Sequence, residues 1–193
     1  MWIHESFTNY SENLFTEYFY GKEAGAAYVI GTRLGIGNSE PIIGKYDVNS
    51  EGSSDMYSKG GNMLHTIRQI IGDDEKWRSI LRGLNKTFYH QTVTTKQIEN
   101  YVSEQAKRDL STVFDQYLRD IRIPVLEYRL NKKDVDYRWT NCVAGFDMPV
   151  KIVLDSARAM MIFPKTDWQK LKEKKIKKLT VDKNYYVTEK AVK

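Results

Sequence analysis

The sequence predicts an α+β fold in which a helical part, residues 1–121, precedes a small β part, residues 122–193. Apolar residues recur at spacings of three and four in the first part, which indicates helices, and alternate with polar ones after Pro124, which indicates strands. The charge changes at the same place, since the first part carries 13 basic against 16 acidic residues and the second 17 against 9. We therefore expect two domains with a boundary near residue 122.

The apolar spacing predicts six helices in the first part: 7–20, 22–33, 55–71, 73–88, a helix that starts at Thr94, and 110–121. Gly21 is expected to end the first helix, and Thr94 with Gln97 forms a capping box. Phe7, Tyr10, Leu14, Phe15 and Tyr18 would form the buried face of the first helix, with Glu5 in its first turn. Between the second and third helices, Gly35–Gly52 is rich in turn-forming residues and predicts a long ordered loop.

The second part alternates with period two. Residues 125–130 and 135–139 are joined by the turn-forming segment Asn131–Asp134 and predict a hairpin. Further strands are expected over 150–154, 160–163, 179–181 and 185–187. A small antiparallel β-sandwich is the economical arrangement of these strands.

Composition restricts the classes of protein to consider. The 193 residues are 41% hydrophobic, which is enough for a core, and the single cysteine, Cys142, excludes an intramolecular disulfide. No run of about 18 apolar residues occurs, so no membrane segment is expected. The net charge of +5 comes mainly from the run Lys170–Lys178, which contains no aromatic residue that could stack on a base. We interpret this run as the solvated edge of a sheet and expect no nucleic-acid partner.

The segment Trp2–Glu12 reads Trp-Ile-x-Glu-Ser-Phe-x-x-Tyr-x-Glu. It resembles the segment that follows the zinc motif in the M1 family of metallopeptidases, the gluzincins related to aminopeptidase N, although Ser6 stands where glycine is usual. The resemblance implies that Glu5 is the third protein ligand of a catalytic zinc ion, beside two ligands from an HExxH helix. No HExxH motif occurs in these residues. On the residues alone, an acidic side chain in a first helical turn is expected simply because it complements the helix dipole.

A second motif, Tyr-x-Lys-Gly at 57–60 followed by Met63 and Leu64, also resembles the M1 family. It implies that the hydroxyl of Tyr57 stabilises the oxyanion formed during peptide hydrolysis, a task for a neutral donor such as a phenol. Gly60 and Gly61 each cost roughly 1 kcal/mol in a helix relative to alanine, so we expect them to allow a close approach of the zinc-ligand helix.

The three histidines, His4, His65 and His90, are interpreted as packing residues rather than ligands. His65 follows the second motif in an apolar helix, where the family has no ligand. His4 is adjacent to Glu5, and neighbouring residues of a helix point about 100° apart.

The sequence therefore predicts the C-terminal portion of a zinc aminopeptidase that removes N-terminal residues from peptides. It would consist of the helical C-terminal half of a thermolysin-like catalytic domain and a β-sandwich domain. We expect the chain alone to be inactive and to bind zinc weakly, with peptides and the upstream part of the same polypeptide as partners.

We also expect a dimer or an exposed apolar patch near Phe7 and Tyr10, where the HExxH helix is missing. The resemblance favours a periplasmic or secreted location. The alternative is a non-catalytic helical and β interaction module derived from the same fold.

Overall fold

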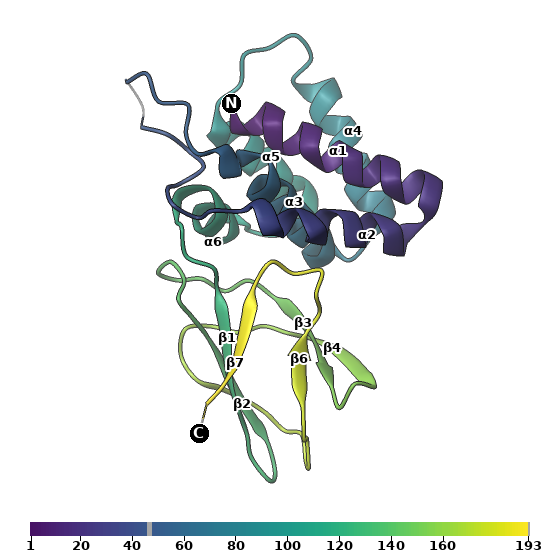
Figure 1. The fold of residues 1–193 in the computed structure, drawn as a ribbon, viewed down its shortest axis with the longest axis vertical. Coiled ribbons are helices and arrows are strands. Elements are labelled where there is room, and N and C mark those ends of the chain that lie inside the picture. The colour runs from purple at the N-terminus through teal and green to yellow at the C-terminus, as the bar shows by residue number, and fades with distance from the viewer. Residues whose placement is uncertain (46–47, 193) are drawn as a thin grey trace.

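The computed structural model describes residues 1–45 and 48–192 and has an α+β fold (Figure 1). Helices fill one half of the molecule and strands the other, and the secondary structure changes within residues 120–124. A single cluster of buried side chains extends through both halves. The predicted change from helices to strands near Pro124 is therefore present, whereas the division into two separate domains stays a prediction.

The helices within the described residues are α1 Trp2–Tyr20, α2 Lys22–Gly31, α3 Ser58–Ile71, α4 Asp74–Thr87, α5 Thr95–Ala106 and α6 Ser111–Phe114. Gly21 separates α1 from α2, and the predicted capping box of Thr94 and Gln97 begins α5. Short 3₁₀ turns, Thr32–Gly35 and Ser54–Met56, flank the predicted loop, of which residues 46 and 47 lie outside the described residues. None of the helices in the described part of the chain has the length and apolar content to cross a membrane.

The last predicted helix is shorter and less regular than expected. α6 continues into a π-helical turn, Asp115–Arg119, and the helical path ends there rather than at residue 121. The buried side chain of Gln116 explains this ending, because its Nε2 donates to the carbonyl of Arg122 (2.7 Å) and its Oε1 accepts from the amide of Val143 (2.7 Å). These bonds turn the chain toward the β half.

The β half contains two sheets, with strand orders β5-β2-β1-β7 and β4-β3-β6. The strands are β1 Val125–Leu130, β2 Val135–Thr140, β3 Val150–Leu154, β4 Arg158–Ile162, β5 Gln169–Leu171, β6 Leu179–Val181 and β7 Thr188–Ala191. β1 and β2 form the predicted antiparallel hairpin. β7 instead runs parallel to β1, so the arrangement is mostly but not entirely antiparallel.

One predicted strand is absent, and two of the strands in the described residues, β5 and β7, were not predicted. Residues 185–187 do not form a strand, because Tyr185 and Tyr186 are buried against other parts of the molecule. The hydroxyl of Tyr185 donates to the carbonyl of Gln69 in α3 (3.3 Å). The short strand β5 was not predicted, but it lies at a sheet edge and carries the exposed Lys170, as the interpretation of the lysine-rich run requires.

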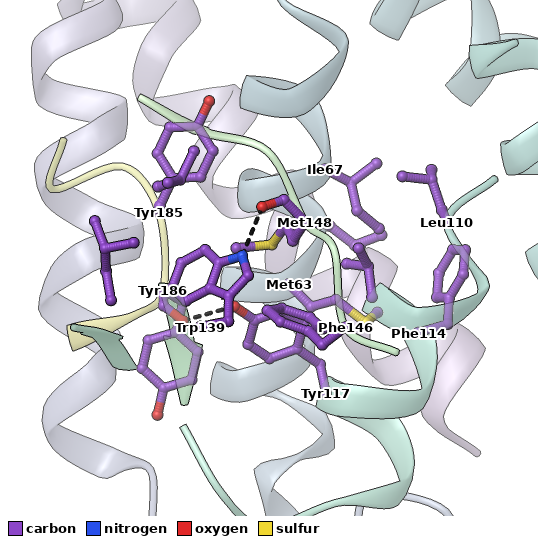
Figure 2. Close-up of a cluster of buried hydrophobic side chains, with 14 of the residues drawn as sticks. Met63, Ile67, Leu110, Phe114, Tyr117, Trp139, Phe146, Met148, Tyr185 and Tyr186 are labelled. Atoms are coloured by element: carbon purple, nitrogen blue, oxygen red, sulfur yellow. Dashed lines mark hydrogen bonds between the residues drawn. The ribbon is translucent and has the colours of Figure 1, made fainter. Parts of the chain in front are cut away.

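The core is centred where α3 meets the β half (Figure 2). Its labelled members are buried side chains from α3, from the segment around α6 and from the β half: Met63, Ile67, Leu110, Phe114, Tyr117, Trp139, Phe146, Met148, Tyr185 and Tyr186. Two hydrogen bonds join members of this cluster, from Trp139 Nε1 to the Met148 carbonyl (2.9 Å) and from the Tyr117 hydroxyl to the Tyr186 carbonyl (2.6 Å). The β half is thus packed firmly under α3.

α1 packs on the rest of the helical half through a mixed polar and apolar face, of which the predicted apolar face forms only a part. Its buried residues are Trp2, Ser6, Tyr10 and Asn13. Tyr10 is buried as predicted, and Phe7 and Leu14 are half-buried. Phe15 and Tyr18, predicted to be buried, are 61% and 83% exposed. The partner helix explains the difference. Gly60 of α3 has no side chain and leaves space for Ser6. The buried guanidinium of Arg68, also in α3, donates two hydrogen bonds of 2.5 and 2.7 Å to the carboxylate of Glu17.

Arg68 also links α3 to α4 and makes stability depend on pH. Its Nε donates to Asp74 Oδ1 (2.8 Å), and this bond is the main cause that lowers the pKa of Asp74 from 3.8 to about 2. A lowered carboxyl pKa stabilises the fold above the unfolded-state value, and the contribution is lost as pH falls toward the folded-state value. We expect Asp74→Asn to destabilise the chain near neutral pH, and the difference from wild type to shrink as pH falls from about 4 toward 2. Urea unfolding measured over this range checks the prediction.

The control is Glu75→Gln in the next position of α4, because the ion pair of Glu75 with Arg78 is mostly exposed. It should change stability little at any pH. A stability loss in Asp74→Asn that stays constant down to the lowest pH at which the chain folds would contradict the role of Asp74.

Candidate active site

Glu5 lies in the first turn of α1 and is half-buried. Among the described residues it forms no ion pair with a lysine, arginine or histidine. No basic side chain therefore neutralises its charge, and carboxylate oxygen is one of the ligands that zinc accepts in proteins. The side chain therefore fits the role of a single ligand.

Tyr57 joins the 3₁₀ turn Ser54–Met56 to the start of α3, and 44% of its surface is exposed. Its phenol lies beside the carboxylate of Glu5. Hydrogen bonding to Glu5, followed by the negative charge of that carboxylate, raises the pKa of Tyr57 above its usual value of 10.0. The phenol is therefore protonated at neutral pH and can donate a hydrogen bond. The structure thus brings together the two residues that the motifs single out.

Ser6 holds this pair together. Its Oγ donates to the carbonyl of Met56 at 2.7 Å, so the residue after Glu5 is bonded to the residue before Tyr57. A Cβ atom at Gly60 would lie 2.0 Å from Ser6 Oγ, which shows that this contact requires glycine in α3. At Gly61 a Cβ would lie 2.7 Å from Asn9 Oδ1. The predicted close approach of the two helices is confirmed.

The turn that carries Tyr57 is also bound to the preceding loop. Asp55 is 4% exposed, and its two carboxylate oxygens accept hydrogen bonds from the amides of Gly37 (2.8 Å) and Asn38 (2.7 Å). These partners are backbone amides of the preceding loop, which no side-chain pattern could have indicated.

The histidines do not join the site. His65 is 2% exposed, its Nε2 is hydrogen-bonded to Asn184 Oδ1 (3.0 Å), and burial lowers its pKa. His4 and His90 both line a groove on the other side of α1, which Glu5 does not line. In the part of the chain that the structure describes, no three His, Cys, Asp or Glu side chains are grouped as a metal site.

This groove lies between α1 and the end of α4 and has a volume of about 680 Å³. Most of its lining is apolar and includes Ile3, Phe7, Leu14, Leu81 and Leu84. Phe7 is half-buried there and Tyr10 is only 1% exposed, so the apolar surface predicted near these two residues has the form of a groove, and the dimer stays a prediction. A group of exposed aromatic residues lies further along the chain, at the end of α1: Phe15, Tyr18, Phe19 and Tyr20.

The arrangement of helices and sheets also occurs in a solved structure. The crystal structure of Legionella pneumophila aminopeptidase A in complex with aspartic acid matches with a TM-score of 0.67 at 17% sequence identity. The match covers 96% of this chain but 23% of that one, and at this identity it shows a shared fold alone. No curated protein sequence gives a significant match.

The sequence comparison is more specific. A family model described as the peptidase family M1 domain matches residues 1–117, which is more than half of the chain. The chain belongs to peptidase family M1. The resemblance noted in Trp2–Glu12 and around Tyr57 is thereby confirmed at the level of the family.

Proposed function

We propose that this chain is the part of an M1 zinc aminopeptidase that provides the third zinc ligand, Glu5, and the oxyanion-stabilising residue, Tyr57. The observation that carries the proposal is the hydrogen bond that places these two residues near each other. Glu5 lies in α1 and Tyr57 directly before α3, and Ser6, the residue after Glu5, donates from Oγ to the carbonyl of Met56, the residue before Tyr57. The carboxylate suits a metal ligand, and the exposed, protonated phenol suits a hydrogen-bond donor to substrate.

The chemistry would be divided between this chain and the HExxH helix of the family. Zinc, when bound, polarises a peptide carbonyl and lowers the pKa of a water molecule. Glu5 would hold the ion, and Tyr57 would donate to the carbonyl oxygen of the substrate as negative charge develops on it. A phenol keeps its proton at neutral pH and can therefore donate this hydrogen bond. Peptides with a free N-terminus are the substrates that the family resemblance implies.

The groove beside α1 is a suitable contact surface for the part of the enzyme that would carry the HExxH helix. Its apolar lining would receive an apolar helix face from the upstream part of the same polypeptide. The exposed aromatic residues at the end of α1 would be covered by the same upstream part.

A zinc-binding experiment tests the proposal. We expect that the purified 193-residue chain does not bind added zinc tightly and does not cleave an aminoacyl chromogenic substrate. The reason is that a hydrolytic zinc site needs three protein ligands. Fusing the HExxH-bearing portion of an M1 peptidase in front of the chain should give one bound zinc ion and turnover. Mutation of a residue that only supports a metal ligand typically weakens metal binding roughly 10- to 100-fold. Glu5→Gln in this fusion should weaken zinc binding by more than that.

The matched control is Glu12→Gln on the same helix. Glu12 is exposed and accepts a hydrogen bond from Tyr28 (2.5 Å), away from Tyr57. This variant should bind zinc like the unchanged fusion. A fusion whose zinc affinity is the same with Glu5→Gln as with Glu12→Gln would overturn the ligand assignment and favour the non-catalytic interaction module.

A further inference from the structure

Lys59 is fully buried but forms no ion pair with a described carboxylate. Its side chain, in the first turn of α3, is 0% exposed. Its Nζ donates to the backbone carbonyl of Asp120 at 2.8 Å. Burying an ammonium group is costly unless its charge is compensated, and a hydrophobic residue would fill the same space without this cost. We therefore interpret the hydrogen bond to the Asp120 carbonyl as the reason for a lysine at this buried position.

The surroundings show that the bond to the carbonyl is the specific contact of Lys59. The nearby carboxylates of Asp55 and Asp120 favour its charge, while burial lowers its pKa. Both carboxylates have other partners, however. Asp55 accepts from two loop amides, and Asp120 Oδ2 pairs with Arg122 Nη2 at 2.6 Å. The ammonium is thus aimed at the backbone where the chain leaves the helical half.

We infer that Lys59 is a positioning residue for Tyr57, and that it anchors the tyrosine-bearing turn to the segment leading into the β half. The inference rests on the proposed function. The turn is held on three sides, by Ser6 from α1, by Asp55 through the loop, and by Lys59 through Asp120. The last anchor depends on the β half, because Gln116 fixes the same segment by bonding both the Arg122 carbonyl and the Val143 amide.

The first test replaces the donor and keeps its shape. Lys59→Met retains an unbranched apolar stem but cannot bond the Asp120 carbonyl. In the zinc-loaded fusion, we expect kcat to fall roughly ten- to a hundredfold, because a displacement of about 1 Å at a reacting group has an effect of that size. KM should change by less than about threefold, since the hydrogen bond of Tyr57 is made mainly in the transition state. Lys59→Arg, which keeps a cationic donor, should recover most of the loss.

The chain offers a matched control in Lys76→Met. Lys76 Nζ donates to the backbone carbonyl of Ala106, also at 2.8 Å, but joins α4 to the end of α5. Both variants lose the same kind of bond, so both should lower stability. Only Lys59→Met should lower kcat. The double variant Tyr57→Phe with Lys59→Met should be no slower than Tyr57→Phe alone, because Lys59 acts through Tyr57.

A spectroscopic measurement gives a readout without turnover. In the 193-residue chain with ¹³C-labelled tyrosine rings, the signal of Tyr57 is the one that disappears in Tyr57→Phe. Lys59→Met should shift this signal, whereas Lys76→Met should not. Equal kcat losses in the two lysine variants, or a Tyr57 signal that stays in place in Lys59→Met, would overturn the positioning role. An unchanged kcat in Tyr57→Phe would overturn the proposed function instead, and the shift would still decide whether Lys59 positions the ring.

Discussion

Replacing Tyr57 by phenylalanine is expected to lower kcat of the zinc-loaded peptidase by roughly 10²- to 10³-fold, the effect of removing one oxyanion donor. KM should change little, because the lost hydrogen bond strengthens only as charge develops on the substrate oxygen. Phenylalanine keeps the ring, and Tyr57 is 44% exposed, so the fold should tolerate the change. Initial rates over a range of concentrations of an aminoacyl chromogenic substrate give both constants.

Tyr28→Phe is the matched control for this experiment. Tyr28 is 40% exposed, and its hydroxyl donates to the carboxylate of Glu12 on α1, so the variant also deletes a phenol beside a glutamate. Its kcat should equal that of the unchanged enzyme. If the two phenylalanine variants were equally active, Tyr57 would have no role in the reaction.

The parts of the fold that could be predicted from sequence are those fixed by local chemistry. The capping box at Thr94 and the turn between the paired strands β1 and β2 act within a few residues, and both are present. The buried face of α1 could be predicted only in part, since Tyr10 is buried as expected but Phe15 and Tyr18 are exposed. The remaining contacts depend on α3, where Gly60 leaves space for Ser6 and Arg68 donates to Glu17.

The same distinction applies to the site. Glu5 and Tyr57, the residues that we propose for the reaction, stand in motifs that resemble the family, so the sequence alone was enough to single them out. Asp55 and Lys59 bond to backbone amides and to a backbone carbonyl. Nearly every residue has these groups, so their partners leave no pattern in the sequence. Residues that hold a site in place through the backbone become recognisable only when the distant segments are seen together.

The largest effect on stability is expected for Gly60→Ala. The added Cβ would lie 2.0 Å from Ser6 Oγ and 2.7 Å from Ser6 Cβ, so rotating the hydroxyl cannot relieve the clash and the helices must separate. Overpacking of about 1–3 kcal/mol and the loss of the buried Ser6–Met56 bond outweigh the gain of roughly 1 kcal/mol in helix propensity. We expect a net loss of about 2–4 kcal/mol in the free energy of unfolding, measured with urea.

A compensating change separates this clash from a general effect of alanine in a helix. Gly31→Ala, at the end of α2 with no atom within 4 Å of the added Cβ, should be neutral or stabilise the chain by up to about 1 kcal/mol. Ser6→Gly removes both atoms that the new methyl group would meet, so Gly60→Ala should be tolerated in that background. If Gly60→Ala destabilised the chain equally with Ser6 and with Gly at position 6, the contact between α1 and α3 would not be what requires Gly60. The close approach that sets Glu5 beside Tyr57 would then need another cause.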